Sequence, residues 1–88
     1  MKANFKADKT IKIDYEIDLP YYCKSRLSFY KILDEKTAIK VEYWDQKHYT
    51  IAIINAETAF NCSEKPCDKE EFDLAFQQVS TFINRINE

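Results

Sequence analysis

The sequence predicts an α+β fold, an antiparallel sheet of about four strands with one C-terminal amphipathic helix packed on one face. Strict alternation of apolar and polar residues over 10–17 indicates a half-buried strand. Aromatic and β-branched residues fill 27–33 and 39–44, as in further strands. Apolar residues recur at three- and four-residue spacing over 69–87, which indicates the helix. With 45% hydrophobic and 15% aromatic residues, the 88-residue chain carries enough apolar surface for one domain, residues 1–88.

The first predicted strand has one apolar and one charged face. Its apolar face holds Ile11, Ile13, Tyr15 and Ile17. Asp14 and Glu16 lie on the other face, where two carboxylates that resemble a catalytic pair are better explained as solvated charges. Pro20 lacks an N–H to continue a ladder, so we expect the strand to end just before it.

Three segments, 27–33, 39–44 and 49–54, are predicted to form a meander with polar turns at 34–37 and 45–47. The first segment has an alternative. Pro20 is also suited to the first turn of a helix, and such a helix would bring Cys23, Leu27 and Tyr30 onto one face. The sequence leaves open whether residues 20–33 form a strand or a helix.

The C-terminal helix has a well-marked beginning. Asp68 is placed as its N-cap, and Glu71 follows at the spacing of a capping box. Cys67 and Phe72 have the spacing of a hydrophobic staple. The apolar face contains Phe72, Ala75, Phe76, Val79, Ile83 and Ile86.

Composition excludes several classes of function. The chain contains no glycine, so phosphate-binding loops, dinucleotide-binding turns and nucleophile elbows are absent in their usual forms. The net charge is −2 and basic residues are spread along the chain, which makes nucleic acid an improbable partner. No apolar run reaches membrane-spanning length and residues 1–6 lack a signal-peptide core, so we expect a cytoplasmic protein with no membrane partner.

The chain's cysteines and its single histidine are candidates for chemistry. Cys23, Cys62, Cys67 and His48 together have the composition of a zinc site, but no Cys-x-x-Cys pair is present. His48 beside a cysteine would suit a nucleophile and its base, yet no known nucleophile motif surrounds any cysteine. A Cys62–Cys67 disulfide is a further alternative. Reduced, partly buried thiols are the commoner outcome, so we expect no metal, no cofactor and no catalytic residues.

The sheet face away from the helix is the candidate binding surface. The helix is expected to cover Ile11, Ile13, Phe29, Ile39, Val41, Tyr49, Ile51 and Ile53. Alternation then turns Tyr30, Ile32, Trp44 and Ile54 outward, and Tyr21 and Tyr22 extend this cluster. Aromatic anchors of this kind are typical of protein interfaces. The partner would be another protein or a second copy in a homodimer, unless the segment around Phe5 folds over the cluster.

Two segments carry a resemblance. The hairpin at residues 30–41 and the capped helix start at residues 68–76 resemble small proteins of bacteriophages and mobile elements in AT-rich bacteria. Such proteins include anti-CRISPR inhibitors, which act without catalysis by occupying a surface of a host defence complex. The resemblance implies this class of function and gives no residue a role.

Overall fold

The structure is a computed structural model that describes residues 2–7, 13–45 and 48–86. Strands β1 (Lys2–Ala7) and β2 (Ile13–Asp18) pair as a separate two-stranded sheet. The main sheet has the order β6-β5-β4-β3-β7 and is antiparallel throughout. Its strands are β3 (Tyr21–Lys24), β4 (Ser28–Ile32), β5 (Thr37–Asp45), β6 (His48–Asn55) and β7 (Lys65–Pro66). The helices are α1 (Ala56–Cys62) and α2 (Lys69–Ile86).

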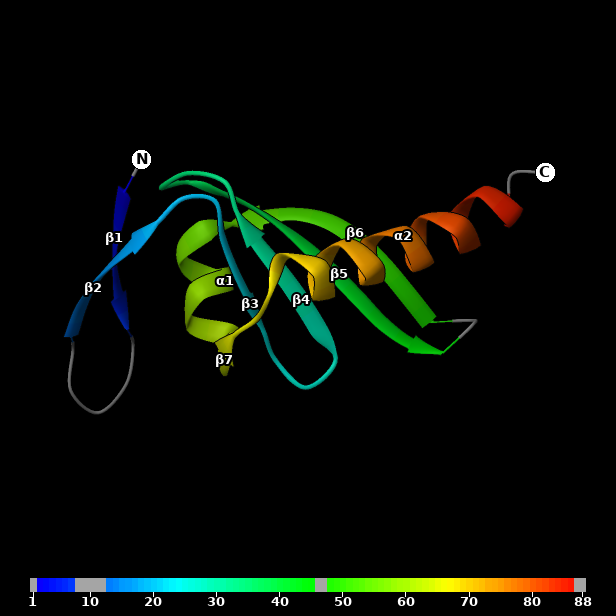
Figure 1. Cartoon of the computed structure of the whole chain (residues 1–88), viewed down its shortest axis with the longest axis horizontal. Coiled ribbons are helices and arrows are strands. Elements are labelled where there is room, and N and C mark those ends of the chain that lie inside the picture. Colours follow the sequence, from blue (N-terminus) through cyan, green and yellow to red (C-terminus); the bar gives the residue numbers. More distant parts are fainter. Residues whose placement is uncertain (1, 8–12, 46–47, 87–88) are drawn as a thin grey trace.

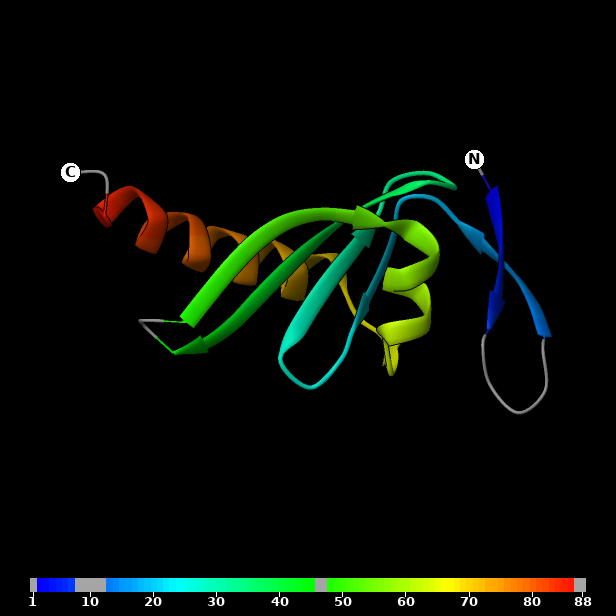
Figure 2. The same ribbon diagram turned by 180° about the vertical axis from the view of Figure 1, so that it is seen from behind.

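The two helices lie on opposite faces of the main sheet. Helix α2 crosses one face and extends past the paired ends of β5 and β6, whereas α1 packs behind the sheet near the β4–β5 turn (Figure 1). Seen from the other side, α1 covers only that end, and none of the described helices and strands lies in front of the rest of β5 and β6 (Figure 2). The predicted α+β class, with a C-terminal helix on an antiparallel sheet, is confirmed.

The α2 core follows from the alternation of apolar residues on the central strands. Val41, Phe72 and Val79 are buried there. The predicted helix-facing residues Phe29, Ile39, Tyr49 and Ile51 pack against them. Ile53 belongs to the same alternating series but is 78% exposed, so the prediction that α2 covers it is wrong. The two remaining residues of that prediction are Ile11 and Ile13. Ile11 and the side chain of Ile13 lie outside the described part of the chain.

The N-terminal half differs from the prediction in two ways. The strand predicted at 10–17 exists from Ile13 as β2, but it pairs with β1 instead of joining the meander. Residues 21–24 and 28–32 form the antiparallel pair β3–β4, so the helical alternative after Pro20 is wrong. Alternation explains the choice, because β4 has buried side chains at Ser28, Tyr30 and Ile32, a period of two.

Helix α1 was not predicted. It begins after Asn55, whose side chain accepts a 3.2 Å hydrogen bond from the Thr58 N–H. Its buried residues are Ala56 and Ala59, which let the helix lie close to the sheet. The α1 core consists of Cys23, Tyr30, Ile32, Ala38, Ala56 and Ala59. Ile17 and Leu19 also pack against it, which ties the end of β2 to α1.

Side-chain caps fix the hairpin and the start of α2. Asp34 Oδ1 accepts hydrogen bonds from the N–H groups of Lys36 and Thr37 at 2.7 and 2.8 Å, which closes the predicted β4–β5 turn. Glu71 Oε2 accepts from the Asp68 N–H at 3.0 Å, as the predicted capping box requires. The same carboxylate lies 2.7 Å from Lys24 Nζ, so the helix start is also joined to β3.

A pair of alanine substitutions, one buried and one exposed, tests the burial on the α1 side of the sheet. Ile32→Ala should lower the free energy of unfolding by about 2–5 kcal/mol, because it opens a cavity under α1. Leu74→Ala, at a site 67% exposed on α2, should change it by no more than about 0.5 kcal/mol. Urea unfolding of both variants measures the difference. Equal effects would contradict the described cover of Ile32.

Candidate protein-binding surface

The six residues predicted to form one binding cluster do not form a common exposed surface in the structure. Tyr30 and Ile32 are 4% and 0% exposed beneath α1, so the expectation that they face solvent is wrong. Ile54 and Tyr21 pack against the same core, and Tyr21 also contacts the Phe60 ring. The alternation had placed these side chains on the correct face, but α1 covers that part of it.

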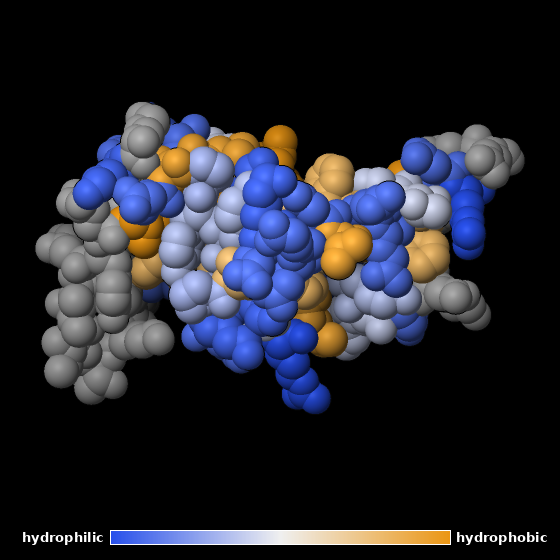
Figure 3. Space-filling view, viewed as in Figure 1, coloured by the Kyte–Doolittle hydropathy of each residue, from blue (hydrophilic) through white to orange (hydrophobic). Residues whose placement is uncertain are grey.

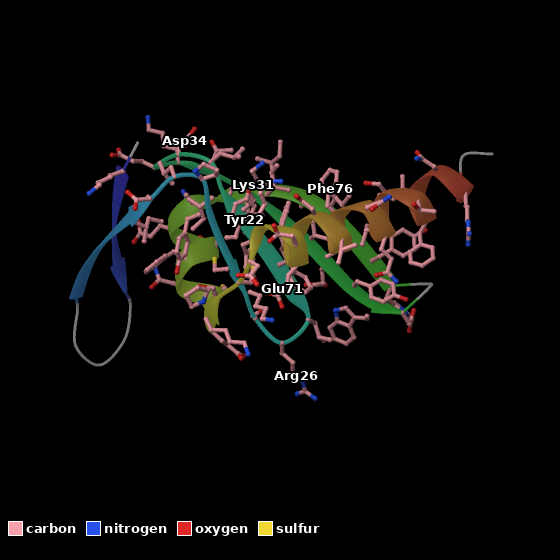
Figure 4. The ribbon with its side chains drawn as sticks, in the orientation of Figure 1. Tyr22, Arg26, Lys31, Asp34, Glu71 and Phe76 are labelled. Carbon is pink, nitrogen blue, oxygen red and sulfur yellow. The ribbon has the colours of Figure 1, made fainter. Side chains whose placement is uncertain are left out.

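Tyr22 lies on the opposite face from the rest of the predicted cluster. Its ring centroid is 5.7 Å from that of Phe72 on α2, and Lys31 Nζ lies 5.7 Å above the ring. Figure 4 shows Tyr22 and Lys31 close together beside the first turns of α2, with Glu71 near them. Tyr22 is therefore part of the α2 packing and does not extend a surface on the other side.

Trp44 is the member of the predicted cluster that remains well exposed, with 60% of its surface accessible. It lies near the end of β5, beyond the part of the sheet that α1 covers. Cross-strand register pairs Lys40 with Ala52 and Glu42 with Thr50 on this same face. We call Lys40, Glu42, Trp44, Thr50 and Ala52 the open sheet surface.

A carboxylate organises this surface. Glu42 Oε2 lies 3.0 Å from Lys40 Nζ and accepts a hydrogen bond from Ser28 Oγ at 3.2 Å. The Trp44 side chain also hydrogen-bonds to Glu42. The bonded Lys40 ammonium lowers the pKa of the Glu42 carboxyl below its ordinary value of 4.5, with smaller contributions from Ser28 and Trp44. The exposed indole is thus held by a charged group that stays ionised at neutral pH.

The titration of Glu42 should be visible in the fluorescence of Trp44, the chain's single tryptophan. Because the folded-state pKa is lowered, the Glu42 contacts persist above pH 4.5 and are lost as the pH falls through that lower pKa. We expect an emission change with its midpoint below 4.5. Glu42→Gln should abolish this change, whereas Asp45→Asn should leave it in place. A step that survives Glu42→Gln would contradict the network.

The face that carries α2 offers a less organised alternative. Polar residues dominate it, and apolar ones appear as separate spots (Figure 3). An open hollow runs along the outer side of the helix, lined by Leu74, Gln77, Gln78, Thr81, Phe82 and Arg85. Leu74 is 67% exposed. In the described part of the chain, however, no hydrogen bond holds a polar side chain of this hollow in position to contact a ligand.

The cysteines are free thiols, so the alternative of a Cys62–Cys67 disulfide is wrong. Burial raises the pKa of the Cys23 thiol to about 11, and burial also raises the pKa of Cys67. A nucleophilic cysteine needs the opposite shift. His48 Nδ1 contacts Asp45 Oδ1 at 3.0 Å in the exposed β5–β6 turn. Within residues 2–7, 13–45 and 48–86, no three His, Cys, Asp or Glu side chains are grouped as metal ligands.

Thiol labelling should separate the cysteines by burial. Cys62 is exposed, so it should react with an aromatic disulfide reagent in the folded protein. Cys23 is buried and protonated, so it should react only when the chain unfolds. Mass spectrometry of the labelled peptides gives the order of reaction. A Cys23 that reacts as fast as Cys62 in the folded protein would contradict its described burial.

Comparisons with protein families, with curated proteins and with solved structures gave no match to this chain. The functional argument therefore depends on the described side chains. No helix in the part of the chain that the structure describes is long and apolar enough to cross a membrane.

Proposed function

We propose that this protein is a non-enzymatic binding module that recognises another protein through the open sheet surface, with Trp44 as its anchor. The observation that carries the proposal is an indole 60% exposed on a strand of the main sheet and hydrogen-bonded to Glu42. Tryptophan is enriched among the residues that dominate interface energies.

The surroundings of Trp44 favour a protein partner. Trp44 lies at a register shift of the β5–β6 ladder, between the pairs Tyr43↔Tyr49 and Asp45↔His48, so its flanking backbone is fixed by β6. Lys40 and Glu42 neutralise each other beside the indole, and Thr50 and Ala52 are small and uncharged. An exposed aromatic anchor beside polar side chains fits the composition of a protein interface.

The class of partner comes from the resemblance of residues 30–41 and 68–76 to small phage proteins. It supports a host defence complex as the target and inhibition by occupancy as the mode of action. The raised pKa of Cys23 is in keeping with a protein that works by contact, because a buried, protonated thiol is a poor nucleophile.

Trp44→Ala should remove binding while the fold is retained. Tagged wild-type and variant proteins are used to capture partners from a host lysate, and the captured protein is then purified and titrated calorimetrically. We expect near-equimolar capture by the wild type and at least about 30-fold weaker binding by Trp44→Ala, the loss typical of a hot spot.

Leu74→Ala is the matched control, because Leu74 is also exposed but lies on α2, on the opposite face of the sheet. It should bind as the wild type does. If the captured protein is a defence component, expression of the wild type should restore phage growth in a host carrying that defence, and Trp44→Ala should not. Equal binding by the wild type and Trp44→Ala would refute the proposed surface.

A further inference from the structure

Strand β6 forms one edge of the main sheet and is eight residues long. Its inner side pairs with β5 from Thr37↔Asn55 to Asp45↔His48, and in the described part of the chain no strand pairs with its outer side. An unpaired edge of this length presents backbone donors and acceptors that invite another strand.

The hydrogen-bond pattern identifies the outward groups. The Ala56 N–H donates to the Lys36 C=O at 3.0 Å, which continues the β5–β6 ladder by one pair. Bonded pairs alternate along an antiparallel ladder, so Thr50, Ala52 and Ile54 direct their backbone groups toward β5. Their alternates, at positions 49, 51, 53 and 55, therefore direct N–H and C=O groups outward.

The same assignment follows from the neighbouring ladder. The Tyr43 N–H donates to the Leu27 C=O and the Leu33 N–H to the Thr37 C=O, so the odd-numbered residues of β5 bond to β4. The backbone groups of the even-numbered residues of β5 therefore hydrogen-bond to β6. Both ladders give the same set of four outward residues on β6.

Natural proteins usually protect such an edge with lysine, proline, a bulge or a covering loop. Residues 49–55 contain no charged residue, no proline and no glycine. Four of them are β-branched, and Ile53 is 78% exposed on the α2 side. This segment therefore meets another strand with no charge to desolvate and an apolar side chain to bury.

We propose that β6 pairs antiparallel with β6 of a second copy about a two-fold axis at Ala52, which joins the two main sheets into one. In this register all four outward residues form hydrogen-bonded pairs with the second copy, because Tyr49 faces its Asn55 and Ile51 faces its Ile53. Ala52 of one copy faces Ala52 of the other as a non-hydrogen-bonded pair. The two strands approach most closely at such a pair, and the small methyl side chain fits there.

The edge of β6 is self-complementary, and for this reason we assign a second copy of the chain as the strand that pairs with it. Ile39 pairs with Ile53 and Val41 with Ile51 inside one chain. The two-fold places the second copy's Ile51 on the other side of Ile53, so the isoleucine left exposed in one chain gains an apolar neighbour on each side. The β6–β6 interface contains no pair of like charges, because residues 49–55 are uncharged.

Solution mass tests the pairing. Wild type should sediment as a dimer of two 10.5 kDa chains at high micromolar concentration. Ile53→Lys should sediment as a monomer with an unchanged circular-dichroism spectrum, since it places like charges at the β6–β6 interface, and Ile53→Thr should remain a dimer. Leu74→Lys adds the same charge on α2, so it should also remain a dimer. A monomeric wild type, or a dimeric Ile53→Lys, would overturn the proposal.

Cysteine cross-linking tests the register in a Cys62→Ser background, which removes the exposed thiol. Ala52→Cys should form a disulfide-linked dimer on mild oxidation, since non-bonded pairs have Cα atoms about 4.5 Å apart. Thr50→Cys should not, because its two copies would lie about 13 Å apart. The reverse result would refute this register.

The pairing and the partner surface are separable. Trp44→Ala should remain a dimer, and Ile53→Lys should still capture the partner of the open sheet surface. A strand of another protein bound at β6 while the wild type stays monomeric would refute the second-copy assignment.

Discussion

The structure depends on one constraint, that the central strands have apolar side chains on both faces. In β4, Tyr30 and Ile32 point one way and Phe29 the other, so a single helix leaves one face uncovered. Helix α1 supplies the second layer at one end of the sheet. Where it stops, side chains on that face turn polar, and the Glu42 ion pair with Lys40 takes the place of apolar packing.

Much of the fold was predictable because it depends on local pattern. The period of two located β4, β5 and β6, and the capping residues located the start of α2. Strands β1, β3 and β7 and helix α1 were not predicted, and for α1 and β7 the reason is the lack of a local pattern. A seven-residue helix with Ala56 and Ala59 as its buried contacts has almost no apolar periodicity, and a two-residue strand has none. Alternation assigns a side chain to a face, but what covers that face is a matter of tertiary structure.

The candidate site was predictable to the same extent. Outward alternation identified Trp44, which remains exposed, and equally identified Tyr30 and Ile32, which do not. The role of Glu42 was out of reach, because it requires the β4–β5 register that places Ser28 opposite Glu42. A carboxylate two residues from a lysine is common on solvated strands, and the pairing of β4 with β5 is what brings the Ser28 hydroxyl to this one.

The two edges of the main sheet are very different. At the edge opposite β6, β7 is two residues long and contains Pro66. The Cys67 N–H donates inward to the Tyr22 C=O, so the Pro66 nitrogen faces outward, where proline has no hydrogen to donate. Head-to-tail stacking of many copies would need this edge as an acceptor of β6. Because Pro66 has no N–H there, this edge lacks a donor that such stacking would require, and the two edges of the sheet are not complementary.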